Sequence, residues 1–185
     1  MNNTPTLENE RVILSPLTID NYKKLISIAS QDKLVQYSPS DIATHAGLKN
    51  YVEIALEQQK AGTSIPFIVY DRKNNAFAGC TRFMHINFKN KVLHIGSTWI
   101  GREFQGTGLN TQIKELMLAY AFTTMNFEKV EFRVDERNVA SRKAVEKLGC
   151  ILEGILRKDV YLLNGFKRNT CCYGLLREEW QSNQK

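Results

Sequence analysis

The stretch GREFQGTGLNTQIKELM, residues 101–117, places two glycines, separated by one residue, between a predicted strand and a predicted helix. Gly106 and Gly108 can adopt backbone conformations that other residues avoid, and they let a ligand approach the main chain closely. A helix that begins at such a turn offers unpaired N–H groups and the positive end of its dipole. The stretch therefore predicts a loop that binds an anion, such as a phosphate.

The segments on either side of this loop predict a mixed fold. Apolar runs predict strands over 11–17, 66–71, 76–86, 91–100 and 129–134, and helical spacing predicts helices over 19–29, 46–60, 109–124 and 138–149. Gly149 stands where a helix cap favours glycine, and Asn164-Gly165 predicts the turn of a closing hairpin. We expect an α+β fold, a mixed and largely antiparallel sheet flanked by helices, in a single domain over 1–185.

Composition excludes several classes of protein. The hydrophobic fraction of 43% and the charged fraction of 24% are ordinary for a globular domain. The chain starts with no basic segment followed by an apolar one, and no apolar run approaches the roughly 20 residues of a membrane-spanning helix. We therefore expect a cytoplasmic protein with no membrane partner.

The net charge of +6 suits an anionic ligand or an acidic partner. Nucleic acid is one such partner, but the basic residues are scattered and form no run interleaved with aromatic residues. A solvated basic surface explains the charge, and we expect no nucleic-acid partner.

The cysteines and histidines show no spacing typical of metal ligands. Cys80, Cys150, Cys171 and Cys172 are expected to be structural thiols, with the adjacent pair on opposite faces of a strand. We expect no metal ion.

The two glycines alone leave more than one interpretation open, although a Walker loop is excluded. A dinucleotide fingerprint would need a third glycine, where this chain has Thr111. A phosphate loop of the Walker type would need Gly-Lys-Ser/Thr, which does not follow. A tight turn without a ligand also fits.

The wider sequence favours one family. QGTGLN (105–110) resembles the Q/R-x-x-G-x-G/A loop of the GCN5-related N-acetyltransferase (GNAT) superfamily, although Asn110 departs from the usual Gly or Ala. Together with VEFRVDERNVASRKAVEKLGCILEGILRK (130–158) and NGFKRNTCCYGLLREEW (164–180), it is similar to the RimJ/RimL type, the ribosomal-protein N-terminal acetyltransferases and their relatives. The resemblance covers nearly the whole chain.

The resemblance implies that the protein binds acetyl-coenzyme A. Backbone groups of the loop would bind its pyrophosphate, namely those of Gln105, Gly106, Thr107, Gly108, Leu109 and Asn110. Backbone groups near Trp99 and Ile100 would pair with the pantetheine arm like an added strand, while the Trp99 indole is expected to pack in the core. Asn138 would bond the same arm. Arg142 would meet the phosphates or remain a solvated surface charge.

The resemblance also implies the catalytic groups. Ser141, in the family's N-x-x-S motif, would donate a proton to the departing sulfur, because Val145 stands where many relatives carry a tyrosine acid. His94 stands where relatives carry a glutamate, and a neutral histidine can act as the general base. We expect His94 and Thr98 to share one strand face. A chain of water molecules could replace a dedicated base.

These expectations together describe an N-acetyltransferase that transfers acetyl directly to a primary amine in a ternary complex. The acceptor would be a protein N-terminus, including that of a ribosomal protein, or a small amine. Its specificity would lie in residues 30–65 and in the closing hairpin. The alternative is a catalytically silent acyl-CoA-binding or sensor module on the same fold. We expect a monomer or a homodimer.

Overall fold

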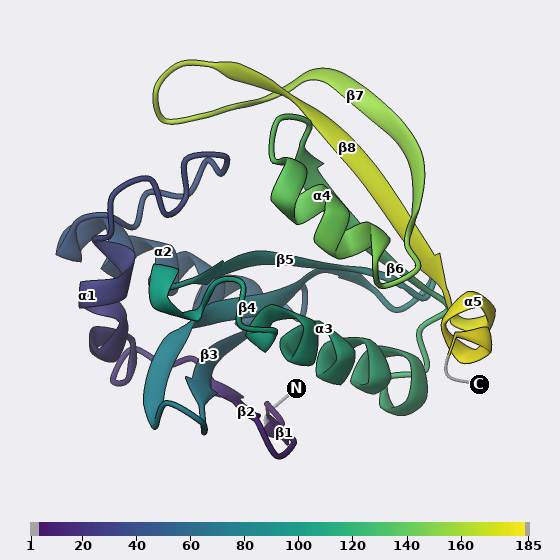
Figure 1. Ribbon diagram of the computed structural model, residues 1–185, viewed down its shortest axis with the longest axis horizontal. Coiled ribbons are helices and arrows are strands. Elements are labelled where there is room, and N and C mark those ends of the chain that lie inside the picture. Colours follow the sequence, from purple (N-terminus) through teal and green to yellow (C-terminus); the bar gives the residue numbers. More distant parts are fainter. Residues whose placement is uncertain (1–3, 184–185) are drawn as a thin grey trace.

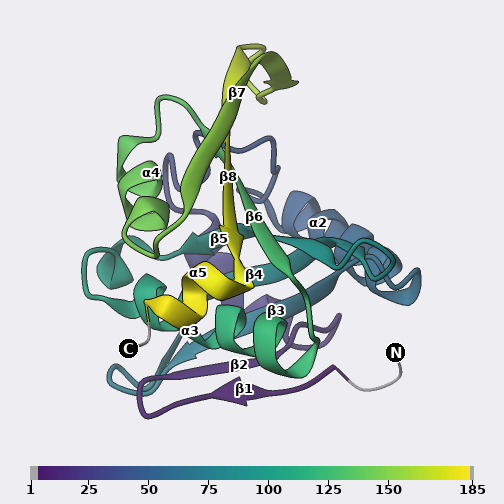
Figure 2. The same cartoon turned by 90° about the vertical axis from the view of Figure 1, so that its right-hand side faces the viewer.

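The computed structural model describes residues 4–183 and contains one eight-stranded sheet with helices on both faces (Figures 1 and 2). The strands are β1 (Leu7–Glu8), β2 (Val12–Pro16), β3 (Ile65–Asp71), β4 (Ala76–Asn87), β5 (Val92–Ile100), β6 (Lys129–Asp135), β7 (Ile151–Tyr161) and β8 (Lys167–Leu176). The α-helices are α1 (Ile26–Ala29), α2 (His45–Lys60), α3 (Leu109–Ala119), α4 (Val139–Glu146) and α5 (Arg177–Ser182). None of these helices is long and apolar enough to cross a membrane.

The strand order along the sheet is β1-β2-β3-β4-β5-β6-β8-β7. Every neighbouring pair is antiparallel except β5 and β6, which are parallel. The chain leaves β5 through the glycine loop and returns to β6 along α3, so this β5–α3–β6 unit is the one crossover between parallel neighbours in the described chain. The expected mixed, largely antiparallel sheet is confirmed.

Two apolar cores hold the helices to the sheet. On one face, Leu109, Ile113 and Met117 of α3 pack with Val145 of α4 against the central strands. On the other face, Tyr51 and Val52 of α2 pack with α1 against residues that include Trp99. The helical spacing of the buried α3 residues is the pattern that predicted this helix. After Ala119 the helix continues as a π-helix, Tyr120–Thr124.

The first predicted helix is shorter than expected. A 3-10 helix, Tyr22–Leu25, precedes the single α-helical turn of α1. Thr18 and Asn21 explain the delay, because each side chain accepts a hydrogen bond from the other's backbone N–H, at 2.9 Å and 3.2 Å. Such bonds stabilise a turn in competition with a helix. The short elements β1 and α5 were not predicted, since they are too brief to show a periodic pattern.

The two glycine turns were predicted correctly. Gly149, after α4, has a φ of +88°, and Gly165, in the turn between β7 and β8, has a φ of +79°. Both values lie in the left-handed region, which favours glycine. Figure 1 shows the resulting long β7–β8 hairpin above α4.

The four cysteines are free, as expected of structural thiols. Burial raises the pKa of Cys80 and of Cys150 to about 12, so neither is a thiolate at neutral pH. Cys171 is buried and Cys172 is partly exposed, in agreement with their placement on opposite faces of β8. Among residues 4–183, no three His, Cys, Asp or Glu side chains are grouped closely enough to hold a metal ion.

Candidate functional site

The parallel strands β5 and β6 pair only at their beginnings. Val92, Leu93 and His94 face Lys129, Val130 and Glu131, and beyond these residues the register ends. We call the two diverging stretches, Ile95–Ile100 and Phe132–Asp135, the fork. Each stretch is paired on its outer side, with β4 or with β8, and has no strand partner on its inner side. The fork therefore offers two inner backbone edges to a polar, extended ligand.

The glycine loop lies at the open end of the fork, directly after β5. Gly106 and Gly108 have φ values of +72° and +83°, and a Cβ on either would meet no atom within 4 Å. Glycine is therefore needed at these positions for the left-handed backbone conformation, and not because a larger side chain would clash with its neighbours. Their surroundings are open, as a loop that receives a ligand requires.

The loop turns the chain so that α3 begins without a side-chain cap. Its N-cap residue is Gly108, which has no side chain to accept the hydrogen bonds of the first turn. Gln105 fixes the loop to the strand end, since its amide donates to the Ile100 carbonyl at 3.1 Å. Thr107 donates to the Phe104 carbonyl at 2.7 Å. The first N–H groups of α3 are thus available to an anion.

The start of α4 lies at the end of the other strand of the fork, β6. Asn138 is its N-cap, and the side-chain oxygen accepts the Ser141 backbone N–H at 3.1 Å. The Asn138 side-chain amide and the Ser141 hydroxyl donate no hydrogen bond within residues 4–183. Asn138 therefore caps α4, and both remaining donors are available to a ligand.

Arg142 points toward β8. Its Nε donates to the Tyr173 hydroxyl at 3.0 Å, and one terminal nitrogen donates to the Glu136 carbonyl at 3.3 Å. These bonds give Arg142 a structural function at the base of α4. Its contact with a coenzyme phosphate stays a prediction.

Strand β5 carries a bulge within the fork. Trp99 pairs with Cys80 and Gly96 pairs with Arg82, so Ser97 and Thr98 together oppose the single residue Thr81. Ser97 has a φ of +47°, which is uncommon for a residue other than glycine. The Trp99 side chain is only 5% exposed and packs edge-on against Tyr51, as expected for a core residue.

The bulge changes which residues share a face. Ile95 belongs to the core on the α3 side, so His94 points to the opposite face of the sheet. Thr98 faces α3, because its hydroxyl accepts a hydrogen bond from Lys114 of that helix. The expectation that His94 and Thr98 lie on one face was wrong, since the extra residue in the bulge inverts the alternation.

His94 lies at the closed end of the fork, at the last paired position of β5. Its Nε2 lies 3.0 Å from a carboxylate oxygen of Glu131, the residue opposite it on β6. Burial lowers the pKa of His94 to about 4, although Glu131 acts in the opposite direction. A carboxylate only accepts hydrogen bonds, so Nε2 carries the proton and Nδ1 keeps a lone pair.

Charges around Glu131 keep it ionised. Burial pushes the pKa of Glu131 upward, but Lys129 and His94 together with Arg133 hold it below the usual value. Lys129 and Arg133 each lie 3.1 Å from its oxygens. His85 completes the group, with its ring centroid 4.7 Å from that of His94. Sequence reasoning missed Glu131 because the partnership depends on the register of β5 against β6.

Residues 30–44, between α1 and α2, connect the glycine-loop end of the molecule to the hairpin. At one end the Gln31 side chain accepts the Arg102 backbone N–H at 2.9 Å. Further on, Arg168 of β8 donates to the Tyr37 carbonyl at 2.7 Å. The Arg137 guanidinium lies between the two regions, 5.5 Å from the Tyr37 ring centroid and 3.8 Å from that of Phe166. The two regions expected to select the acceptor are therefore in contact. Their role in specificity stays a prediction.

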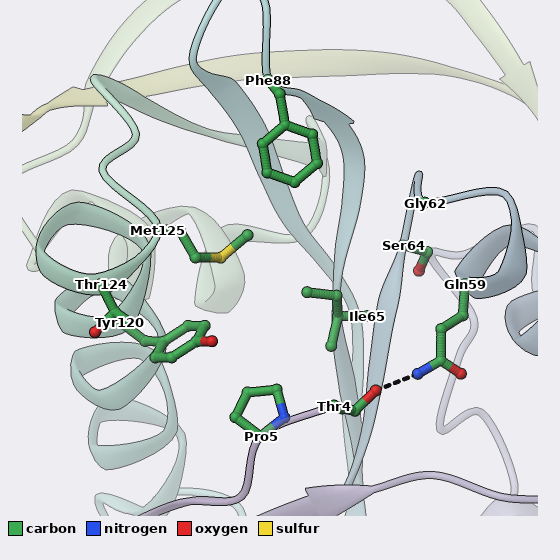
Figure 3. Close-up of a pocket in the computed structure, with 10 residues that line it drawn as sticks. All are labelled: Thr4, Pro5, Gln59, Gly62, Ser64, Ile65, Phe88, Tyr120, Thr124 and Met125. Atoms are coloured by element: carbon green, nitrogen blue, oxygen red, sulfur yellow. Dashed lines mark hydrogen bonds between the residues drawn. The ribbon is translucent and has the colours of Figure 1, made fainter. Parts of the chain in front are cut away.

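A separate pocket of about 340 Å³ lies at the other end of α3 (Figure 3). The rings of Tyr120 and Phe88 point into it, and Thr4 and Gln59 are hydrogen-bonded at its edge. None of its ten lining residues is charged or belongs to the glycine loop or the fork. This pocket is therefore no candidate for the predicted phosphate site.

Comparison with known proteins identifies the family. The family model for the acetyltransferase (GNAT) domain matches residues 11–151. The chain belongs to the GNAT acetyltransferase family. The matched range contains β2–β6, the glycine loop, the fork and α4, so the candidate site lies within the part of the chain that matches the family.

Individual relatives are distant. YdaF of Bacillus subtilis, which bears the name "Putative ribosomal N-acetyltransferase", is 28% identical over 117 residues, which are 63% of this chain and 61% of YdaF. A spermidine N(1)-acetyltransferase of Escherichia coli is 31% identical over 108 residues, 58% of this chain and 57% of the enzyme. The chain thus matches about three fifths of the length of these two curated relatives.

A solved structure matches the whole architecture. A GCN5-related N-acetyltransferase from Brucella melitensis superposes with a TM-score of 0.85 at 25% identity, covering 97% of this chain and 81% of that one. The sheet with its parallel pair and flanking helices is therefore the GNAT fold, as the resemblance implied.

Proposed function

We propose that the protein is an acetyl-CoA-dependent N-acetyltransferase that acts on a primary amine by direct transfer. One observation carries the proposal: an uncapped helix start, reached through two left-handed glycines, lies at the open end of a fork with unpaired backbone edges. This combination offers one place for a pyrophosphate and one for an extended polar arm.

The residues present fit the coenzyme. No side chain stands where Gly106 and Gly108 leave space, and the first turn of α3 has no competing cap. Backbone groups of Gln105–Asn110 would hold the pyrophosphate, and those of Trp99 and Ile100 would hold the arm. The Asn138 amide is a further donor for the arm. When bound, acetyl-CoA supplies an acetyl group activated as a thioester.

The residues at the two ends of the fork would move the protons. His94 is neutral at physiological pH and, through Nδ1, can accept a proton from the attacking amine. Glu131 stabilises the charged imidazole that results, in the way that a carboxylate supports a catalytic histidine. Because a pKa of about 4 makes His94 a weak base, it must pass the proton on, and the exposed His85 beside it leads toward solvent.

Ser141 would support the departing sulfur. Its hydroxyl donates no hydrogen bond within residues 4–183, and it lies on the first turn of α4 beside Asn138. A thiolate with a pKa near 8.5 needs only a well-placed donor to leave.

The acceptor is a protein N-terminus or a small amine. The name of YdaF refers to a ribosomal acceptor and that of the E. coli relative to spermidine, so the names of similar proteins support testing both classes. The test is the release of free thiol from acetyl-CoA with a panel that contains tripeptides with a free N-terminus, the same tripeptides with a blocked N-terminus, and spermidine.

Each outcome of this panel decides between specific alternatives. Turnover with the free but not the blocked tripeptides assigns the N-terminal class, and turnover with spermidine alone assigns the small-amine class. Coenzyme binding by calorimetry without thiol release from any amine would favour a silent acyl-CoA-binding module. Absence of coenzyme binding would refute the proposal. Glu131 argues for the enzyme, because it supplies a carboxylate in contact with His94, the expected general base.

A further inference from the structure

Lys114 is a buried cation without an acidic partner. It lies on the sheet-facing side of α3, and it is only 6% exposed. Its Nζ donates to the Thr98 hydroxyl at 2.5 Å and lies 3.5 Å from the Thr81 hydroxyl. The ion pairs formed within residues 4–183 do not include it.

Such a residue lowers stability. Burial lowers the pKa of Lys114 to about 7, since transfer of an ammonium group from water into the core is unfavourable. The neighbouring buried positions of the helix are occupied by Ile113, Met117 and Leu118. An apolar side chain of similar length would suit this environment better, so the lysine needs an explanation other than packing.

The contacts of Lys114 lead to the bulge in β5. The Thr98 hydroxyl, which accepts the hydrogen bond from Lys114, lies 2.7 Å from the Thr81 hydroxyl and 3.4 Å from the Gly96 carbonyl. The last contact spans Ser97, the residue with the left-handed backbone. From the other face of the sheet, the Tyr51 hydroxyl donates to the Ser97 carbonyl at 3.4 Å. Side chains from α3 and α2 thus hold the bulge from both sides.

The bulge lies in the part of β5 that forms one arm of the fork. Its backbone groups on the β6 side have no strand partner. The dihedral angles at Ser97 set the direction of these groups. A change in their direction would shift the bound coenzyme arm, and with it the thioester, relative to the acceptor amine. Positional errors of about 1 Å can reduce turnover by about 10²-fold.

We propose that Lys114 is a positioning residue of the acetyl-transfer site: by holding Thr98 it fixes the bulge at Ser97, and with it the backbone groups of β5 that would align the coenzyme arm and its thioester. The inference rests on the proposed function. Lys114 of α3 would thus align β5. This function explains why a destabilising lysine is kept in the core.

The test compares Lys114→Met with Leu118→Met, a matched control at another buried position of α3. Methionine keeps the length of the lysine and removes its charge and donors. We expect Lys114→Met to be as stable as the unaltered protein or more stable in urea, to bind coenzyme A within threefold of the original affinity, and to lose about 10- to 100-fold in kcat. Leu118→Met should change none of the three substantially.

A second variant tests the route through Thr98. Thr98→Val should lower kcat by a similar factor, Thr98→Ser should restore it, and the double variant of Lys114→Met with Thr98→Val should lose no more than either alone. A kcat within threefold of the original in Lys114→Met overturns the inference. Parallel losses of stability, coenzyme affinity and kcat also overturn it, because they indicate a purely structural lysine. If the unaltered protein neither binds coenzyme A nor releases thiol, the proposed function itself fails.

Discussion

At the scale of single residues, the protonation of His94 affects the free energy of unfolding. Its side chain is 20% exposed, and it is held between Glu131 and His85. The folded protein prefers the neutral form, because burial lowers the pKa of His94 to about 4 from an ordinary value of 6.5. Between these two values the unfolded chain binds more protons than the folded one.

We predict that stability falls as the pH is lowered from 6.5 to 4. The free energy of unfolding should decrease by at most about 3 kcal/mol from His94, with the full stability present above pH 6.5. Urea denaturation at several pH values measures this. His94→Gln removes the titration and should flatten the curve over the same window, whereas an unchanged pH dependence would show that His94 titrates normally.

Ser141 and Asn138, at the start of α4, are expected to have different functions, and single substitutions can separate them. Ser141→Ala should reduce kcat by about 10- to 1000-fold, comparable with the loss of one transition-state donor, while coenzyme binding persists. Folding should be little affected, because the capping bond uses the Ser141 backbone N–H and not its hydroxyl. Normal turnover in this variant, where chemistry limits the rate, would show that water protonates the sulfur.

Asn138 needs a variant that keeps the helix capped. Alanine would cost about 1 kcal/mol of helix stability by removing the cap. Asn138→Asp preserves the capping oxygen and removes the side-chain amide. We predict at least a tenfold weaker affinity for coenzyme A at unchanged thermal stability, measured by calorimetry and by thermal unfolding. Unchanged affinity would restrict Asn138 to its capping function.

At the scale of elements, the decisive feature is the start of α3. Gly108 has a φ of +83°, so any side chain there is strained, and charge must be tested separately from shape. Gly108→Asn introduces a residue that tolerates this conformation, and Gly108→Asp adds a negative charge of nearly the same size. We predict that Asp abolishes coenzyme A binding, whereas Asn weakens it much less. Equal effects of the two would mean that backbone strain and not the anion site explains the loss.

The crossover between β5 and β6 also accounts for the fork. Parallel strands joined by a helix place their carboxyl ends at one edge of the sheet, and both following helices, α3 and α4, begin there. The bulge at Ser97 and the early end of the β5–β6 register then leave the inner backbone edges free. The fork, where the pairing of β5 with β6 is interrupted, is thus the part of the fold best suited to a ligand.

At the scale of the whole molecule, residues 30–44 contact the hairpin, and both belong to the regions expected to select the acceptor. Arg168 makes this contact through the Tyr37 carbonyl, and the neighbouring Lys167 points away, over the ring of Tyr161. We predict that Arg168→Met raises the KM for the amine about tenfold, the effect of one charged hydrogen bond, with coenzyme affinity unchanged. Lys167→Met is the control. A raised coenzyme Kd in Arg168→Met would contradict a function limited to the acceptor side.

The sequence by itself determined the elements with a strong local signal. The apolar stripe of α3, the alternation in β6, the turn at Gly165 and the open backbone at Gly106 and Gly108 depend on residues near one another in the chain. The QGTGLN loop, together with the stretches 130–158 and 164–180, also indicated the GNAT family correctly, because a glycine turn and the sequence that follows it are local features. The assignment of Gln105–Asn110 to the pyrophosphate remains a prediction.

Only the tertiary structure decided how distant residues meet. The pairing of His94 with Glu131 depends on the register of two strands that α3 separates in the chain. The opposite faces of His94 and Thr98 depend on a bulge, which adds one residue without leaving a mark in the apolar pattern. Lys114 could be recognised as a buried cation only when α3 was placed on Thr98. Local propensities specify helices and strands, whereas register, bulges and burial are set by the packing of one element against another, and this packing also fixes the charges of the candidate site.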